Sequence, residues 1–201
     1  MAQKTLVLLA LSFLFAAILM IQFGPPRIKY WFTDRYEIYF APEFTLPPDA
    51  TEALPQDEVI REYKTRGFKL TCYGGLHREE KVNASNDYLC WAFTKQAYNN
   101  IPAKMVTFFF SQGTLNDVRV EFPESSHPAL KDYLLKRLAR FPRHHWKKET
   151  DIFGERLVSW ITPNGIITVS EQATKNQPII LLWNNHKQPK SLPKIQTIEK
   201  I

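Results

Sequence analysis

The sequence predicts an α+β fold: an N-terminal transmembrane helix, then one domain with a mainly antiparallel sheet and two helices on one face. Three observations predict it. Residues 5–23 are apolar and uncharged, short alternating segments are joined by turn residues, and two helical patterns separate the runs of strands. Runs of strands divided by helices are typical of α+β domains, whereas a parallel nucleotide-binding sheet needs regular strand–helix alternation.

Composition sets the outer limits of this interpretation. The chain has 201 residues, of which 44% are hydrophobic and 23% charged, which is ordinary for a folded protein. This length is room for one domain and an appendage. The net charge of +6 permits anionic lipid, nucleic acid or acidic proteins as partners without choosing among them.

The N-terminal segment TLVLLALSFLFAAILMIQF is predicted to be an uncleaved signal-anchor at residues 1–23. As a helix, residues 5–23 would span about 28 Å, close to the roughly 30 Å hydrocarbon core of a bilayer. The alternative is a cleaved signal peptide, whose apolar run is about 7–15 residues long and ends in a small-x-small site. Met20, Gln22 and Phe23 make a poor site of that kind.

The orientation of this anchor has evidence on both sides. Lys4 is the single basic side chain before the apolar run, and Arg27, Lys29 and Arg35 follow it, so a strict count of basic residues favours a cytoplasmic body. A short N-terminal flank is the usual form of a signal-anchor with an exported body. The two cysteines, discussed below, favour the second arrangement, so we expect the main domain on the exported, periplasmic side.

Residues 24–55 are predicted to be a juxtamembrane connector, extended and partly rigid because proline blocks helices. Six of the 14 prolines lie here: Pro25, Pro26, Pro42, Pro47, Pro48 and Pro55. Tyr30, Trp31 and Phe32 are predicted to lie at the membrane interface, where aromatic rings are favoured. The alternative for residues 36–40 is a first strand docked on the domain.

Cys72 and Cys90 are the only cysteines of the chain. Each lies in a strand-like pattern, at 68–73 and 88–95, on the face that could pack inward. An anchor ahead of them favours a disulfide, since such bonds persist in exported domains. It would close a loop worth about 3 kcal/mol; two buried thiols are the alternative. Between them, Asn83 begins a glycosylation sequon, a weak signal.

The globular domain is expected over residues 56–186. A helix at 56–67 has acidic residues in its first turn and Gly67 at its end. The clearest hairpin, 104–122, alternates apolar and polar residues on its second strand, as a half-covered antiparallel strand does. A helix at about 126–141 has an apolar stripe, with Pro128 in its first turn.

The remaining elements are a second hairpin and a last strand. Residues 156–161 and 165–170 flank Pro163, Asn164 and Gly165, which are strong turn residues. A strand follows at 178–183, and residues 187–201 form a polar tail without a firm pattern. The sequence shows no internal repeat.

The sequence has no motif that would supply a catalytic, metal or cofactor site. It lacks GxSxG and HExxH, and Gly74-Gly75 is not followed by a helix start. His77 lies in a charged loop that is best explained by solvation. His144 and His145 are adjacent, so they point in different directions and do not form a chelating pair. A hydrolase remains an alternative that would need a histidine and a carboxylate converging in a concave site.

The basic run is the one functional surface that the sequence suggests. The predicted basic patch consists of Lys136, Arg137, Arg140, Arg143, Lys147 and Lys148. Its structural explanation is that cations near a helix C-terminus complement the macrodipole.

We therefore expect a membrane-anchored, non-enzymatic interaction module, an accessory subunit or binding partner in a cell-envelope complex. The alternative is a module that binds an anionic lipid surface or another polyanion through the basic patch. No cofactor is expected, and nucleic acid is a poor partner for an exported domain.

Overall fold

The computed structural model describes residues 7, 11, 12, 15, 26–146, 157–173, 175 and 177–185. The chain divides into two compact units, Met1–Phe40 and Ala41–Ile201, which are described separately. Helices and strands follow in this order: α2 (Pro26–Phe40), η1 (Pro48–Ala50), α3 (Gln56–Thr65), β1 (Thr71–Gly74), η2 (Arg78–Glu80), β2 (Tyr88–Phe93), β3 (Gln96–Ala97), β4 (Ile101–Pro102), β5 (Met105–Ser111), β6 (Thr114–Phe122), η3 (Glu124–Ser126), α4 (His127–Arg137), β7 (Arg143–Trp146), β8 (Leu157–Thr162), β9 (Gly165–Ser170) and β10 (Ile179–Asn184).

In the first unit, residues 26–40 form the helix α2, so the predictions of an extended connector and of a strand at 36–40 were wrong there. Pro26 occupies the first helical position, where its missing N–H costs nothing, and no proline follows until Pro42. Proline therefore starts and ends this helix rather than preventing it. Among the described residues, no helix is both long and apolar enough to span a bilayer. Segment 5–23 lies almost wholly outside them.

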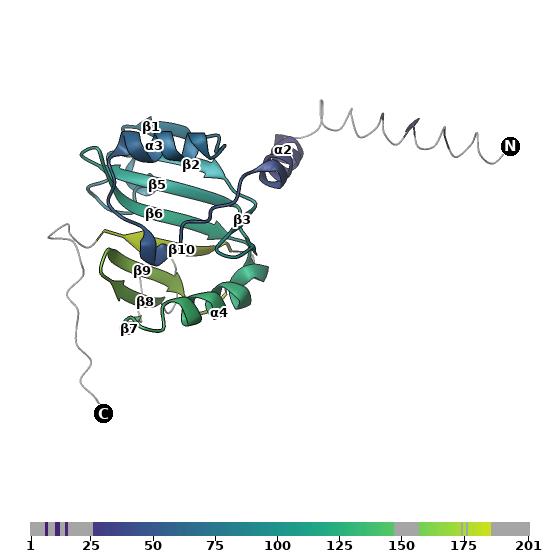
Figure 1. Ribbon diagram of the computed structural model, residues 1–201. Helices are drawn as coiled ribbons and strands as arrows, with labels where there is room; N and C mark the ends of the chain where they lie inside the picture. The colour runs from purple at the N-terminus through teal and green to yellow at the C-terminus, as the bar shows by residue number, and fades with distance from the viewer. Residues whose placement is uncertain are drawn as a thin grey trace. The chain divides into compact units, whose positions relative to one another are not determined.

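The second unit is α+β, as predicted, and is built on an 8-stranded antiparallel sheet (Figure 1). The strand order is β1-β2-β5-β6-β10-β9-β8-β7. The order shows an architectural repeat that the sequence does not reveal. A helix followed by four antiparallel strands occurs twice, as α3-β1-β2-β5-β6 and as α4-β7-β8-β9-β10. The two halves meet where their last strands, β6 and β10, pair antiparallel.

One register row crosses all the strands on the helix-covered face. Its members are, from edge to edge, Cys72, Cys90, Phe108, Val118, Trp183, Ile167, Trp160 and Arg143. The six inner residues of this row belong to the main hydrophobic core. The row therefore begins at the cysteine pair, passes through the core, and ends at an exposed cation.

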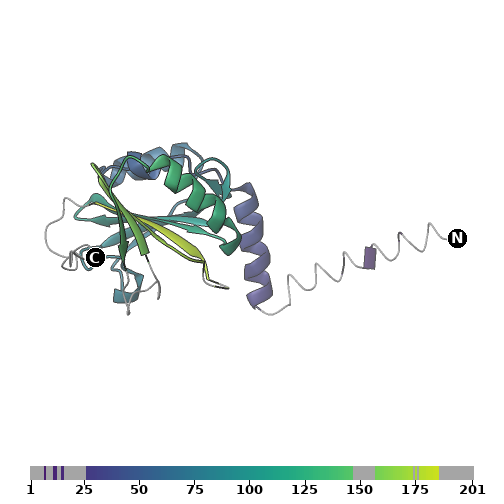
Figure 2. The same cartoon turned by 90° about the horizontal axis from the view of Figure 1, so that it is seen from below.

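Both helices of this unit cover the same face of the sheet, as predicted (Figure 2). α3 contributes Val59 and Tyr63 to the core, and α4 contributes Leu130, Leu134 and Leu138. The α4 residues repeat at the four-residue spacing that the apolar stripe of an amphipathic helix requires. On the opposite face, a smaller cluster of Leu76, Leu89 and Phe109 lies beneath the β1–β2 connection.

Residues 41–55 pack on the domain, so its compact unit begins at Ala41 rather than at the expected Gln56. The Phe44 ring is 1% exposed and stacks on Tyr63 with ring centroids 5.7 Å apart. The Leu54 carbonyl accepts a hydrogen bond of 2.8 Å from the Leu115 N–H. This proline-rich segment is thus a covering layer of the core.

The two predicted hairpins are present, and each turn has a local cause. Between β5 and β6, Gln112 and Gly113 both have positive φ, at 51° and 73°. Two such residues form a turn whose twist matches that of the flanking strands. Between β8 and β9, a Cβ at Gly165 would lie 2.5 Å from the Trp183 indole nitrogen. Only glycine lets this indole lie against the turn.

The disulfide Cys72–Cys90 is present, which confirms the predicted pairing. The two cysteines lie directly opposite each other on β1 and β2. Cys90 is fully buried in the core. The bond therefore fastens the edge strand β1 to its neighbour.

We expect the double variant Cys72→Ala/Cys90→Ala to lose about 3 kcal/mol of unfolding free energy. The bond closes a loop of about 17 residues and so lowers the conformational entropy of the unfolded chain. Urea unfolding of the full chain in detergent, with and without reductant, measures this. Reductant should destabilise the wild type and leave the double variant unchanged. Equal wild-type stability in both conditions would contradict a structural role for the bond.

Candidate functional site

A cleft of about 200 Å³ lies between α4 and the strands β7, β8 and β9. Its floor includes Val158, Trp160 and Val169, all buried apolar residues of the core. Its two walls are the side of α4 and the edge strand β7. The floor is therefore apolar, and the chemical character of the cleft comes from its walls.

The α4 wall consists of His127, Lys131 and Leu135. These residues are four apart, so they lie one above another along a single side of the helix. They are next to the stripe that α4 buries in the core. Leu135 is 38% exposed, which leaves an apolar side chain open at the cleft.

The β7 wall consists of Arg143 and His145, which alternate along the strand and so share a face. They lie opposite Trp160 and Val158 of β8. Sequence analysis placed Arg143 in a basic patch and did not predict β7. The segment Arg-His-His-Trp has neither apolar alternation nor β-branched residues, so pairing with β8 is what makes it a strand.

Each histidine of the cleft has one polar contact near the C-terminal end of β9. The His127 Nε2 lies 3.3 Å from the Ser170 carbonyl oxygen. The His145 Nδ1 lies 3.6 Å from the Glu171 Oε1. No carboxylate in the described part of the chain lies within ion-pair distance of Lys131 or Arg143. The two walls therefore carry two positive charges without an acidic partner in that part.

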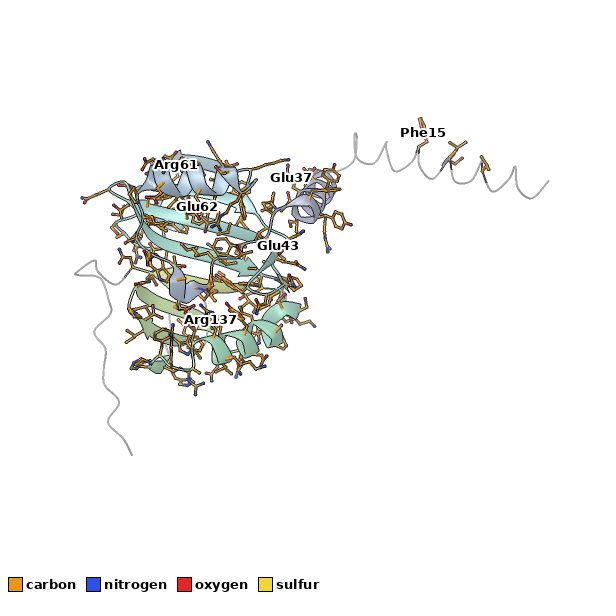
Figure 3. All side chains as sticks on the ribbon, viewed as in Figure 1. Phe15, Glu37, Glu43, Arg61, Glu62 and Arg137 are labelled. Atoms are coloured by element: carbon orange, nitrogen blue, oxygen red, sulfur yellow. A yellow bond between two sulfur atoms is a disulfide. The ribbon has the colours of Figure 1, made fainter. Side chains whose placement is uncertain are left out.

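The structure distributes the predicted basic patch over different surroundings. Arg137, which is labelled in Figure 3, contacts the Asp49 carboxylate of η1 at 2.9 Å. Arg140 lies 3.5 Å from the same carboxylate. The hydrogen bond from Arg137 to Asp49 raises the pKa of Arg137. Lys136 pairs with Asp132 one turn earlier on α4, at 2.8 Å. Of the patch, only Arg143 lines the cleft, and Lys147 and Lys148 lie outside the described residues.

The other residues considered in the sequence are not among the residues that line this cleft. Tyr30, Trp31 and Phe32 belong to α2, and their side chains are not among those described. His77 is the N-cap of η2, and its N–H donates to the Glu80 carboxylate at 2.7 Å. The loop around it is thus explained by local capping. Across the described residues, no cluster of three histidine, cysteine or acidic side chains could hold a metal ion.

Sequence reasoning missed one buried polar cluster, formed by Asp117 and four asparagines. The Asp117 carboxylate is fully buried. It accepts hydrogen bonds from the side-chain amides of Asn83, Asn86, Asn116 and Asn184. Burial raises the pKa of Asp117, and these four hydrogen bonds partly oppose that shift.

This cluster joins β6, β10 and the connection between β1 and β2. A buried acid with a shifted pKa can mark a functional site. Here, however, asparagine side chains of the domain itself satisfy the carboxylate. A structural role follows. Asn83, the first residue of the sequon, takes part in this cluster, since its amide nitrogen donates to Asp117 at 2.6 Å.

Comparison with known proteins gives no relative from which to transfer a function. No family model matches the chain, and neither a curated protein nor a solved structure matches it significantly. The function must therefore be argued from the residues themselves.

We expect Asp117→Ala to lower the unfolding free energy by at least about 3 kcal/mol, because it leaves several buried amide donors without an acceptor. Asp132→Ala removes an exposed carboxylate that meets only Lys136, and should cost less than about 0.5 kcal/mol. Denaturant unfolding of both variants makes the comparison. Equal losses of unfolding free energy would show that the Asp117 cluster stabilises the fold no more than an exposed ion pair does.

A second expectation concerns pH. Because the pKa of Asp117 is raised above its ordinary value of 3.8, the folded chain holds this proton more tightly than the unfolded chain does. Its contribution to stability is therefore largest in acid and is lost as pH rises through the folded pKa. The unfolding free energy of the wild type minus that of Asp117→Asn should fall as pH rises from 3.8 to the folded pKa of Asp117, and should stay constant above it. If this free-energy difference instead rises with pH, the pKa of Asp117 is lowered in the folded chain.

Proposed function

We propose that this protein is a membrane-anchored interaction module whose domain faces the exported side, as an accessory subunit or binding partner in a cell-envelope complex. The observation that carries the proposal is the Cys72–Cys90 disulfide. Structural disulfides persist in oxidising compartments and are rare in the cytosol. The bond thus supports export of the domain and weighs against the cytoplasmic orientation.

The N-terminal unit supports anchoring. Val7, Leu11 and Phe15 are helical and 56%, 57% and 64% exposed. Phe15 is labelled in Figure 3. Exposed apolar side chains at this spacing are unfavourable in water and favourable in lipid. They lie within the uncharged segment 5–23, for which we propose the bilayer as the surrounding medium.

The helix α2 fits the lipid–water boundary. Tyr36, Tyr39 and Phe40 are 67%, 74% and 66% exposed, and the Phe40 ring contacts both tyrosine rings. Aromatic side chains are enriched at membrane interfaces because a ring is apolar while its tip can remain hydrated. The interfacial role predicted for Tyr30, Trp31 and Phe32 thus extends, as a proposal, along the whole helix.

The cleft favours binding over catalysis. His145 and Glu171 bring an imidazole and a carboxylate into a concave site, which a hydrolase would also need. However, Ser170 meets His127 through its backbone carbonyl, and no described hydroxyl is hydrogen-bonded to either ring. At about 200 Å³ the cleft is also smaller than the roughly 300–1,000 Å³ of ligand pockets.

The alternative, a lipid- or polyanion-binding patch, draws less support from the geometry. Arg137 and Arg140 already contact one carboxylate whose side chain is 3% exposed. Lys136 has its own acidic neighbour. The described part of the patch therefore has less unpaired charge than its sequence suggests.

We expect a topology reporter fused after Ile201 to be active on the exported side, and the protein to remain with the membrane after carbonate washing. The cysteines should react with maleimide only after reduction and denaturation. Deleting residues 1–25 from an exported form should release the domain from the membrane. A reporter active in the cytoplasm, or cysteines that label in intact cells, would refute the proposal.

A further inference from the structure

We propose that the cleft and the free edge of β7 together bind one extended, acidic segment of a partner protein, which adds to the sheet as a further strand. The inference rests on the proposed function and specifies the chemistry of the partner. It concerns a surface that combines unpaired backbone groups, an apolar floor and two cations.

Within the described residues, the backbone of β7 is open on the side away from β8. The Pro142 carbonyl accepts the Ile161 N–H at 3.2 Å, which fixes the alternation of hydrogen-bonded pairs along these strands. His144, two residues on, is then bonded to Ser159, while Arg143 and His145 turn their N–H and C=O groups outward. No strand in the described part of the chain pairs with that side.

The residues with outward backbone groups are the same ones whose side chains line the cleft. A strand added beside β7 would pair with Arg143 and His145 through its main chain. Its side chains opposite these residues would point to the same face, toward the cleft. Leu135 would meet an apolar side chain there, while Lys131 and Arg143 would meet carboxylates.

The two edges of the sheet differ in a way that favours this site. In the register row, Cys72 and Cys90 occupy the positions in the first half that Arg143 and Trp160 occupy in the second. The β1 edge is tied to its neighbour by a covalent bond. The β7 edge has an exposed arginine at the matching place.

The positive charge around the β7 edge favours binding of a different protein there over binding of a second copy or of the C-terminal tail of this chain. A second copy pairing β7 with β7 would bring together two Arg-His-His-Trp strands, each followed directly by Lys147, Lys148 and a single acidic residue, Glu149. Like charges opposite each other on paired strands are destabilising. The C-terminal tail is also basic, with Lys187, Lys190, Lys194 and Lys200 against Glu199.

The test selects random linear peptides displayed on phage against the purified full chain in detergent. The inference expects enriched peptides with acidic residues at alternate positions. Synthetic versions distinguish strand addition from charge attraction alone. N-methylation of every second residue should abolish binding in one register and be tolerated in the other, because only alternate amides face β7.

Protein variants locate the site. Lys131→Glu/Arg143→Glu should weaken the acidic peptide about tenfold or more, since two attractive charge pairs become repulsive. Lys136→Glu changes a cation on the same helix that does not line the cleft, and should weaken it less than about twofold. Circular dichroism and unfolding midpoints confirm that the variants are folded.

The proposal is overturned if no acidic peptides are enriched, if both N-methyl registers bind equally, or if Lys136→Glu weakens binding as much as the cleft variants. A dimer of the full chain that Arg143→Glu dissociates would assign the edge to a second copy instead. These outcomes leave the topology results untouched, so failure of this inference and failure of the proposed function can be told apart.

Discussion

The antiparallel pairing of β6 with β10 is the interaction on which the rest of the structure depends. It joins two helix-and-four-strand halves into one sheet, with Val118 opposite Trp183 and Val120 opposite Leu181 on the helix-covered face. Without it, each half would expose the flank of a four-stranded sheet and part of the core. Since the halves meet at their last strands, their first strands become the two outer edges. The pairing therefore decides that the cysteine pair lies at one edge and the cleft at the other.

On the opposite face of the sheet, the same two strands are joined by a polar pair. Asp117 of β6 and Asn184 of β10 lie directly opposite each other and are hydrogen-bonded. A one-residue slip would separate them and turn the apolar residues of both strands to the wrong face. The buried carboxylate loses hydration, and its four amide donors offset that loss. One of the four, Asn184, reaches it only in the native register of β6 and β10. We interpret the cluster as a specificity device for the central pairing.

Most of the sheet could be predicted because its hairpins have strong local signals. The hairpin at 104–122, the helix after it and the disulfide pairing all follow from periodicity, turn residues and residue type. Two elements could not be predicted. β7 is a strand only because β8 offers a partner, and α2 contains the aromatic residues that suggested an extended segment. The cleft was missed for the same reason, since one of its walls is β7.

A free edge strand normally invites uncontrolled pairing, and proteins protect such edges with charge, bulges or covering segments. Beside the β7 edge, Arg143 on the strand and Lys131 on the helix have no acidic partner among the described residues. Positive charge repels a second copy of a basic protein but attracts an acidic strand. The same residues can therefore prevent self-association and select a partner. By contrast, a purely protective edge would need neither the apolar floor nor the exposed Leu135 beside it.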